Sequence, residues 1–320
     1  MRFVTTILAA TFLAASSSFS FSQEKPTIGL TYIVEHPAID AVREGIIEGL
    51  ARAGYKDGES ATVIIRSAQG NMATQAQIAN EFFGLDLDVA LAISTPSAQA
   101  LKNALKDKPL LFAAVTDPVS AGLIALMEEP GGNVTGTSDK QSFEPTLDLI
   151  RKMLPDAKGI GVIFNPGEAN SASQVDALKN AVTPYGLEIV EAPAAQTTLV
   201  GDAARSLVGR VDAILLPTDS TVVSVVESIV TVGKRAGLPV FASDTGSVER
   251  GALAALGFNY FDMGEMTAQM AVRVLNGEKP GDIPAAVPAS QDLYLNLESA
   301  EAMGVSVDDD LRSSAKKVID

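Results

Sequence analysis

The 320-residue chain contains no cysteine, no tryptophan and a single histidine, His36. Without cysteine it can form no disulfide, thiol nucleophile, iron–sulfur cluster or zinc finger. With one histidine, a histidine-based metal cluster is excluded as well. The sequence therefore lacks the groups for much enzyme chemistry, and it predicts neither a bound metal nor a cofactor.

Basic residues are also scarce, since 24 Lys and Arg stand against 39 Asp and Glu, which gives a formal net charge of −15. Nucleic acid and anionic membrane surfaces would both repel such a chain, so we expect neither as a partner. Hydrophobic residues make up 47% of the sequence. At this length and composition we expect two domains, each with its own core.

The N-terminus has the composition of a secretory signal peptide. Arg2 precedes an apolar run over residues 3–15, and small or polar residues dominate 16–22. The apolar run is shorter than the stretch that a membrane-spanning helix needs. The alternative is a membrane anchor that the mature protein keeps. We expect residues 1–22 to be cleaved and the product to be periplasmic, or secreted. No cysteine lies near the cleavage site, so we expect no lipid anchor.

After the leader, short apolar runs that predict strands alternate with amphipathic stretches that predict helices. The predicted strands cover residues 27–32, 61–66, 89–94, 110–115, 133–137, 160–164, 187–191, 213–216, 240–242 and 252–256. Near-continuous apolar strands separated by helices are typical of a parallel sheet that is covered on both faces. Residues 291–297 alternate in polarity like one more edge strand.

The two halves of this series resemble each other. Residues 28–32 match 160–164, and residues 109–117 match 239–244. A period of roughly 130 residues is far too long for a solenoid and indicates two copies of one lobe. The predicted fold class is α/β, with two Rossmann-like lobes built on parallel sheets.

Polar residues follow the predicted strands in both halves. In an open parallel sheet, ligands bind beyond the carboxyl ends of the strands, so these segments are the candidate site. The candidates are His36, Pro37, Asp40, Thr95, Ser97, Ala98, Thr116, Asp117, Asn170, Ser171, Asp219 and Asp244. If the lobes face each other, the loops that carry them converge on one cleft for a small ligand.

These residue types suit a zwitterion such as an amino acid. Helix N-termini offer free N–H groups and partial positive charge, so we expect Thr95, Ser97 and the Ala98 N–H to hold a carboxylate. We expect one of three acids to hold an ammonium group: Asp117, Asp219 or Asp244. Asn170, Ser171 and Thr116 would complete the polar shell, and we expect contacts to the ligand side chain from Tyr32, His36, Phe164 and Tyr260. A role as helix caps alone is the alternative for each polar residue.

Catalytic motifs are missing. No G-x-S-x-G elbow and no P-loop occurs, and the glycine pair at residues 159–161 begins a strand instead of following one. A Ser–His–Asp triad would depend on His36 and has no supporting context. We therefore expect that the protein is not an enzyme. The remaining catalytic alternative is a pair of carboxylates in the cleft that acts on a sugar.

The chain resembles the ABC transporter substrate-binding proteins of the tryptophan/tyrosine type. The resembling segments run in order along nearly the whole mature chain: residues 35–40, 69–71, 95–99, 113–118, 133–139, 170–171, 217–219, 243–244 and 251–254. The resemblance implies a type I periplasmic-binding-protein fold with three crossings between the lobes. It also implies an open free form, and a closed form with bound ligand that is presented to a membrane permease.

On that fold, we expect lobe one to comprise residues 27–138 and 259–280, and lobe two residues 139–258 and 281–320. The resemblance implies an aromatic or other amino acid as ligand, although residues 243–246 depart slightly from the family pattern and leave its identity open. We therefore predict a monomeric periplasmic receptor of an ABC importer. A sensor module for a chemoreceptor or kinase is the alternative, and an exported hydrolase a weaker one.

Overall fold

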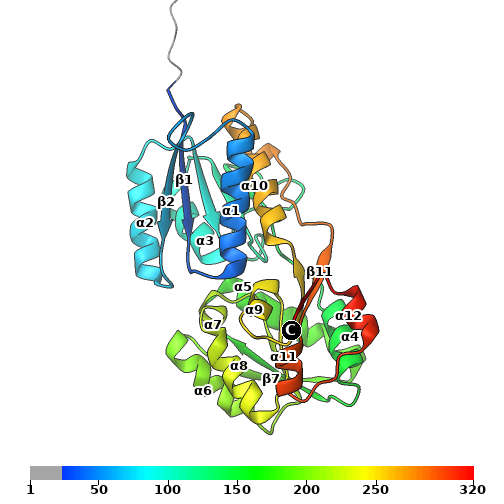
Figure 1. Cartoon of the computed structure of the whole chain (residues 1–320). Coiled ribbons are helices and arrows are strands. Elements are labelled where there is room, and N and C mark those ends of the chain that lie inside the picture. Colours follow the sequence, from blue (N-terminus) through cyan, green and yellow to red (C-terminus); the bar gives the residue numbers. More distant parts are fainter. Residues whose placement is uncertain (1–23) are drawn as a thin grey trace, which may run out of the picture.

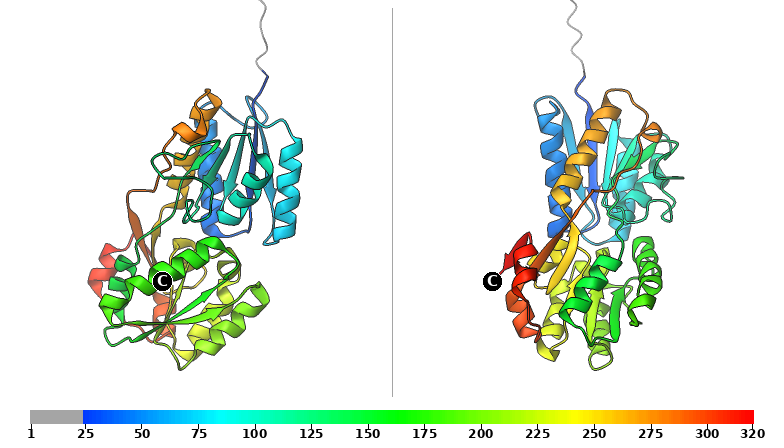
Figure 2. Two further views of the ribbon diagram at one scale, coloured as in Figure 1. Left: turned by 180° about the vertical axis from the view of Figure 1, so that it is seen from behind. Right: turned by 90° about the vertical axis from the view of Figure 1, so that its right-hand side faces the viewer.

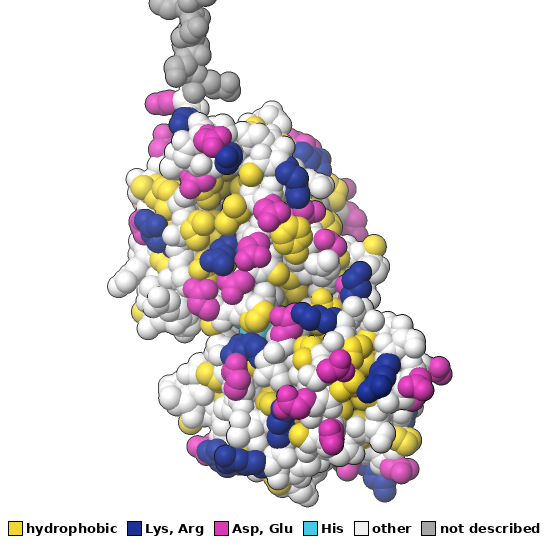
Figure 3. All heavy atoms as spheres, in the orientation of Figure 1, with side chains coloured by type: hydrophobic (Ala, Val, Ile, Leu, Met, Phe, Trp, Pro, Cys, Tyr) yellow, Lys and Arg dark blue, Asp and Glu magenta, His cyan; other side chains and the backbone are white. Residues whose placement is uncertain are grey.

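The computed structural model describes residues 24–320, so the predicted signal peptide lies outside the described residues. Two α/β lobes are stacked end to end and meet at a narrower waist (Figure 1), and two further views show the same arrangement (Figure 2). Acidic and basic side chains are interspersed over the face seen in Figure 3. Nowhere in residues 24–320 does a helix combine the length and apolarity that crossing a bilayer requires.

The first lobe is built on a parallel sheet with the order β2-β1-β3-β4-β5. Its strands are β1 (Thr27–Tyr32), β2 (Thr62–Ser67), β3 (Val89–Ile93), β4 (Leu110–Ala113) and β5 (Val134–Gly136). Its helices are α1 (Pro37–Arg52), α2 (Met72–Gly84), α3 (Thr95–Leu105), α10 (Tyr260–Leu275) and the 3-10 turn η2 (Pro280–Asp282). Every residue of β3 and β4 is buried, because helices cover both faces of the sheet.

The second lobe has a seven-stranded sheet with the order β12-β11-β10-β9-β8-β6-β7, in which only the β10–β11 pairing is antiparallel. Its strands are β6 (Gly159–Phe164), β7 (Glu188–Pro193), β8 (Ala213–Leu216), β9 (Val240–Ala242), β10 (Ala254–Phe258), β11 (Gln291–Asn296) and β12 (Lys317–Ile319). Its helical segments are α4 (Glu144–Met153), α5 (Ala169–Ala181), η1 (Thr183–Tyr185), α6 (Thr197–Leu207), α7 (Ser220–Val223), α8 (Val226–Ala236), α9 (Thr245–Glu249), α11 (Leu297–Ala302) and α12 (Asp309–Ser314).

The strand order confirms the repeat that the sequence predicted. The order β2-β1-β3-β4-β5 in the first lobe recurs as β7-β6-β8-β9-β10 in the second. The second sheet is then extended by β11 and β12. The strand predicted at residues 291–297 is confirmed as β11, but its expected position at the edge is wrong, because β11 pairs on both sides and β12 occupies the edge.

Helix α10 returns the chain to the first lobe by packing tightly along α1. Glycines make this approach possible. A Cβ at Gly45 would lie 2.1 Å from the Phe261 carbonyl oxygen, and one at Gly264 would lie 2.2 Å from the Val42 carbonyl oxygen. The two backbones are therefore too close for any side chain at these positions.

Three chain segments cross between the lobes, as the family resemblance implied. The first follows β5, the second is the short step from β10 to α10, and the third precedes β11. Thr137 in the first crossing pairs with Ala286 in the third. Ile283 is buried in the core of the first lobe, and its carbonyl accepts a hydrogen bond from Thr135 Oγ1. Ile283, just beyond the expected boundary at residue 281, thus packs with the first lobe.

Candidate ligand-binding cleft

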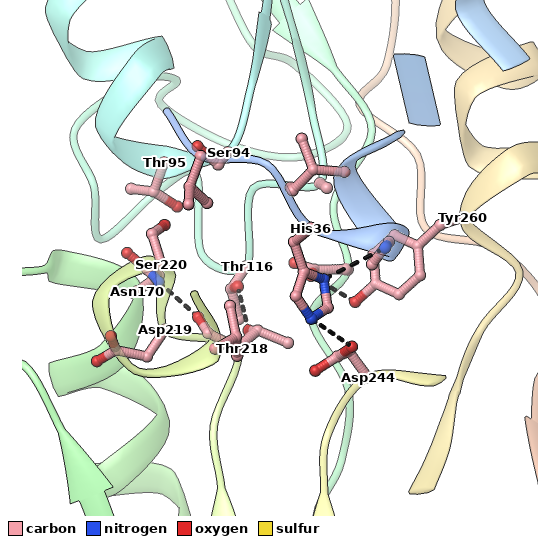
Figure 4. Close-up of a pocket in the computed structure, with 16 residues that line it drawn as sticks. His36, Ser94, Thr95, Thr116, Asn170, Thr218, Asp219, Ser220, Asp244 and Tyr260 are labelled. Atoms are coloured by element: carbon pink, nitrogen blue, oxygen red, sulfur yellow. Dashed lines mark hydrogen bonds and ion pairs between the residues drawn. The ribbon is translucent and has the colours of Figure 1, made fainter. Parts of the chain in front are cut away.

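A cavity lies between the lobes, beyond the carboxyl ends of the parallel strands (Figure 4). Its walls come from both lobes and from the first crossing. The lining residues are Val34, His36, Ala38, Ile39, Ser94, Thr95, Ala114, Thr116, Asp139, Asn170, Thr218, Asp219, Ser220, Val223, Asp244 and Tyr260.

Six helices begin at or beside this cavity, namely α1, α3, α5, α7, α9 and α10, and side chains of the chain itself cap four of them. His36 Nδ1 accepts the Ala38 N–H at the start of α1. Asp219 caps α7 and Asp244 caps α9, through Val222 N and Ser247 N at 2.8 Å each. Helices α3 and α5 differ, because their N-cap residues, Ser94 and Glu168, make no side-chain capping bond. The start of α3 therefore offers N–H groups and partial positive charge to a ligand.

The backbone is strained where β3 and β4 end at the cavity. Ser94 has φ of 79° and Ala114 has φ of 51°, both in the region that favours glycine. Such conformations cost about 1–3 kcal/mol each and persist where the surrounding structure enforces them, often at ligand sites. Here they turn the chain at two adjacent strand ends that line the cavity.

Four buried oxygens on the cavity wall have no hydrogen-bond partner within the described chain: Ser94 Oγ, Thr95 Oγ1, Asp139 Oδ1 and Asn170 Oδ1. A buried polar atom without a partner costs about 1–3 kcal/mol. Four such atoms around one cavity indicate a site that is completed by a polar ligand. The amide of Asn170 donates to the Thr218 carbonyl at 2.6 Å, which leaves its Oδ1 as an acceptor without a partner in that part of the chain.

Three aspartates line this cavity, and Asp139 is the one that has a carboxyl oxygen without a hydrogen-bond partner among the described residues. It lies in the first crossing, is 4% exposed, and accepts the Tyr260 hydroxyl at 3.2 Å through Oδ2. Burial raises the pKa of Asp139, and hydrogen bonding from Thr116 and from Tyr260 partly offsets that rise. A cation beside Oδ1 would stabilise the ionised form of this carboxyl group.

Asp219 is buried too, but its oxygens already have partners. They accept hydrogen bonds from Asn165 N at 2.6 Å, Ser171 Oγ at 2.5 Å and Val222 N at 2.8 Å. Burial, together with the nearby charge of Glu168, raises the pKa of Asp219 to about 7. Its bonds hold three segments of the second lobe together, so Asp219 shapes the cavity wall.

Asp244 and His36 meet across the interface between the lobes. Asp244 Oδ1 lies 3.8 Å from His36 Nε2, and the Ser247 hydroxyl lies 3.5 Å from the same nitrogen. Because Nδ1 accepts the Ala38 N–H, the proton of the neutral ring is on Nε2 and faces the second lobe. Burial lowers the pKa of His36, while Asp244 opposes that change.

A second direct contact between the lobes lies beside the cavity. The hydroxyls of Thr116 and Thr218 are 3.0 Å apart and come from the first and second lobe, respectively (Figure 4). Both residues line the cavity. The lobes are therefore in contact around it rather than splayed apart.

The structure brings part of the predicted site together. The predicted residues that line the cavity are His36, Thr95, Thr116, Asn170, Asp219, Asp244 and Tyr260. Pro37 is the first residue of α1, and Asp40 pairs with Arg43. Ser171 is one helix position beyond the lining and bonds to Asp219.

Three predicted residues, and two of the aromatic side chains, lie elsewhere. Ser97 donates to Gln75 inside the first lobe, and Ala98 belongs to the core, because both project from the side of α3 that packs inward. Asp117 pairs with Lys140 at 2.7 Å and lines a separate hollow. Lys140 and the Ser120 N–H hold the pKa of Asp117 below its usual value, against the opposing effect of burial. Tyr32 and Phe164 do not line the cavity either.

Sequence reasoning also missed lining residues: Val34, Ala38, Ile39, Ser94, Ala114, Asp139, Thr218, Ser220 and Val223. Thr218 and Ser220 lie in a strand-end loop, so their position could have marked them. Asp139 lies in a crossing between the lobes, where no periodicity marks it. Within residues 24–320, no group of three His, Cys, Asp or Glu side chains could hold a metal ion.

Comparison with known proteins identifies the family. Residues 27–319 match the family model of the ABC transporter substrate binding protein. A curated tyrosine-binding protein of Clostridioides difficile is 41% identical over 282 residues, which cover 88% of this chain and 82% of that protein.

Two solved structures show how the lobes are arranged. A Streptococcus pneumonia domain in complex with L-Trp is 32% identical, covers 92% of this chain and 100% of its own, and has a TM-score of 0.89. A ligand-free, open substrate binding protein from Clostridium difficile is 41% identical, covers 92% and 99%, and has a TM-score of only 0.70. The lobes are thus arranged as in the tryptophan complex rather than as in the open structure. The predicted fold and family are confirmed. The chain has a type I periplasmic-binding-protein fold, and it belongs to the family of ABC transporter substrate-binding proteins.

Proposed function

We propose that this protein is an extracytoplasmic receptor that traps a free aromatic L-amino acid between its lobes and delivers it to the permease of an ABC importer, without chemical change. The observation that carries the proposal is a set of three unpartnered buried oxygens around the cavity: Ser94 Oγ, Thr95 Oγ1 and Asp139 Oδ1. The ligands named for the relatives, tyrosine and L-Trp, support the aromatic class.

Asp139 is the proposed partner of the ligand ammonium group. A buried ammonium group needs an ionised, hydrogen-bonded partner to offset its desolvation. Asp139 Oδ1 is buried and free, whereas the Asp219 oxygens and the Asp244 oxygens bind groups of their own lobe. Tyr260 holds the other oxygen of Asp139 and so fixes the direction in which Oδ1 faces.

The start of α3 is the proposed partner of the ligand carboxylate. Ser94 Oγ and Thr95 Oγ1 are hydroxyls without a partner, and both can donate to a carboxylate oxygen. The helix that they begin has no side-chain cap, so its partial positive charge adds to the attraction.

The apolar part of the cavity suits a hydrophobic side chain. Val34 and Ile39 belong to the first lobe, and Val223 belongs to the second. A ring placed between them contacts both lobes, and burying an aromatic side chain contributes about 1.5–3 kcal/mol. Contacts to both lobes favour the closed form over the open one, which is the condition for ligand-driven closure.

Isothermal titration calorimetry tests this function. Protein purified under denaturing conditions and refolded, to remove any bound ligand, is titrated with L-tyrosine, L-tryptophan and L-phenylalanine. Tyramine, which lacks the carboxylate, and 3-(4-hydroxyphenyl)propionate, which lacks the ammonium group, are the matched analogues. We expect at least one amino acid to bind and both analogues to bind about 30-fold more weakly or worse, since losing one partner of a buried ion pair costs 2–5 kcal/mol.

Equal binding of the analogues would contradict recognition of a zwitterion. Turnover of the bound amino acid during long incubation would contradict a receptor role. Delivery to a permease is tested separately: deleting the gene should abolish high-affinity uptake of the radiolabelled amino acid, and unchanged uptake would contradict an importer role.

A further inference from the structure

A second hollow lies between the lobes, next to the cavity that holds the proposed amino acid site. It contains about 860 Å³ of empty space, part of it open to solvent. Its lining residues are Ile33, Gly70, Met72, Pro96, Gln99, Asn165, Gly167, Glu168, Ala195, Thr197, Ser220, Thr221 and Ser224. We call it the outer hollow.

The outer hollow adjoins one end of the inner cavity. Ser220 lines both spaces. Thr95 lines the inner cavity and the next residue, Pro96, lines the outer hollow; Asn170 lines the inner cavity and Glu168, two residues earlier, lines the outer hollow. The boundary between the two spaces is therefore made by the starts of α3, α5 and α7.

This boundary is the carboxylate end of the proposed ligand. Thr95 belongs to the group that would hold the carboxylate, while Asp139 and Tyr260, at the ammonium end, line only the inner cavity. Asp139 follows β5, which is two strands away from β3 in the sheet, or about 10 Å at the usual strand spacing. In Figure 4, Thr95, Asn170 and Ser220 lie on one side of the cavity and Tyr260 lies on the other.

Asn170 at this boundary does not match a free carboxylate. Its Oδ1 is buried, has no partner and can only accept a hydrogen bond. A carboxylate has no hydrogen to donate to it. A peptide bond at the same place has both groups, since its carbonyl can accept from Thr95 Oγ1 and its N–H can donate to Asn170 Oδ1.

Resting on the proposed function, we propose that the site also binds dipeptides whose N-terminal residue is the aromatic amino acid, with the second residue in the outer hollow. The first residue keeps its ammonium group at Asp139 and its ring in the inner cavity. The new terminal carboxylate reaches the outer hollow near Thr197, where α6 begins without a side-chain cap. Extension at the amino end is disfavoured, because it would push a residue against Asp139 and Tyr260, which are both buried.

Calorimetry with three probes on one ligand-free preparation tests the proposal: L-tyrosine, Tyr-Ala and Ala-Tyr, or the tryptophan series if L-tryptophan binds more tightly. We expect Tyr-Ala to bind within about tenfold of L-tyrosine. Ala-Tyr should bind at least about tenfold more weakly than Tyr-Ala, because its ammonium group and its ring cannot both occupy the inner cavity. If the free amino acids bind but Tyr-Ala does not, or if the two dipeptides bind equally, this inference is wrong while the proposed function stands. If no amino acid binds, both are wrong.

A variant separates the two spaces. Ala195 is exposed and lines only the outer hollow. Ala195→Trp fills that space and should weaken Tyr-Ala by about tenfold or more, while L-tyrosine stays within about twofold of its original affinity. Ala302→Trp, at an exposed site on α11, is the matched control and should change neither. If Ala195→Trp loses affinity for both ligands equally, or for neither, a dipeptide in the outer hollow is contradicted.

Discussion

Gly246 offers a way to oppose closure without removing any group that contacts the ligand. It lies in α9 of the second lobe, and a Cβ added there would be 2.8 Å from Ala38 N and 2.9 Å from His36 Cε1. Both of those atoms belong to the first lobe. The clash therefore exists only when the lobes are together, and Gly246→Ala should shift the equilibrium toward the open form.

The size of the effect follows from the packing. Forcing an extra methyl group into a well-packed interface costs about 1–3 kcal/mol. Because the ligand binds tightly only to the closed form, that cost appears in the apparent affinity, which should fall by about 5- to 150-fold. The same Cβ would also lie 3.2 Å from Asp244 Oδ1 in its own lobe, so the fold of the variant must be checked separately.

Calorimetry with the amino acid that binds the wild type, together with thermal unfolding of the ligand-free variant, makes the test. Gly84→Ala is the matched control, since a Cβ at Gly84 meets nothing within 4 Å. We expect Gly246→Ala to lose affinity while its ligand-free melting temperature stays close to that of the wild type. An affinity within twofold of the wild type would refute the idea that this contact is part of the liganded state.

Three further substitutions address single interactions. Asp139→Asn removes the proposed ammonium partner and should raise the calorimetric Kd by about 30-fold or more; an unchanged Kd would remove Asp139 from the site. Thr116→Val deletes the hydrogen bond to Thr218 across the lobes, so affinity should fall roughly 2- to 10-fold, mainly through faster dissociation in stopped-flow traces, and equal dissociation rates would argue against a closing role. Burial raises the pKa of Asp219 to about 7, so the folded state binds the extra proton between about pH 4 and pH 7, and the stability contributed by Asp219 should fall as the pH rises through this window. Urea unfolding gives the free energy of unfolding of the wild type and of Asp219→Asn at each pH. The difference, wild type minus variant, should decline as the pH rises, and a difference that rises with pH would contradict this reasoning.

Much of the fold could be predicted because its signals are local. Strands such as β3 and β8 are short, wholly apolar runs between polar turns, and the matching order of two such series predicted two lobes. The edge assignment of residues 291–297 failed, because alternating polarity does not tell whether a further strand, here β12, pairs beside them.

The site was harder to predict, because position along the chain does not fix the direction of a side chain. Thr95 and Ser97 are two residues apart at the start of α3, yet Thr95 faces the cavity and Ser97 bonds to Gln75 inside the lobe. The acids show the same limit. Asp117 follows a strand as predicted but pairs with Lys140, whereas Asp139 lines the cavity from a crossing segment whose path depends on how the two lobes dock.

The central claim is that a zwitterion closes two rigid lobes, and small-angle X-ray scattering tests it most directly. The radius of gyration of ligand-free protein is measured alone, with saturating L-tyrosine or L-tryptophan, and with tyramine at the same concentration. Contraction with the amino acid but not with tyramine is the predicted result. An unchanged radius of gyration with an amino acid that calorimetry shows to be bound would contradict the account.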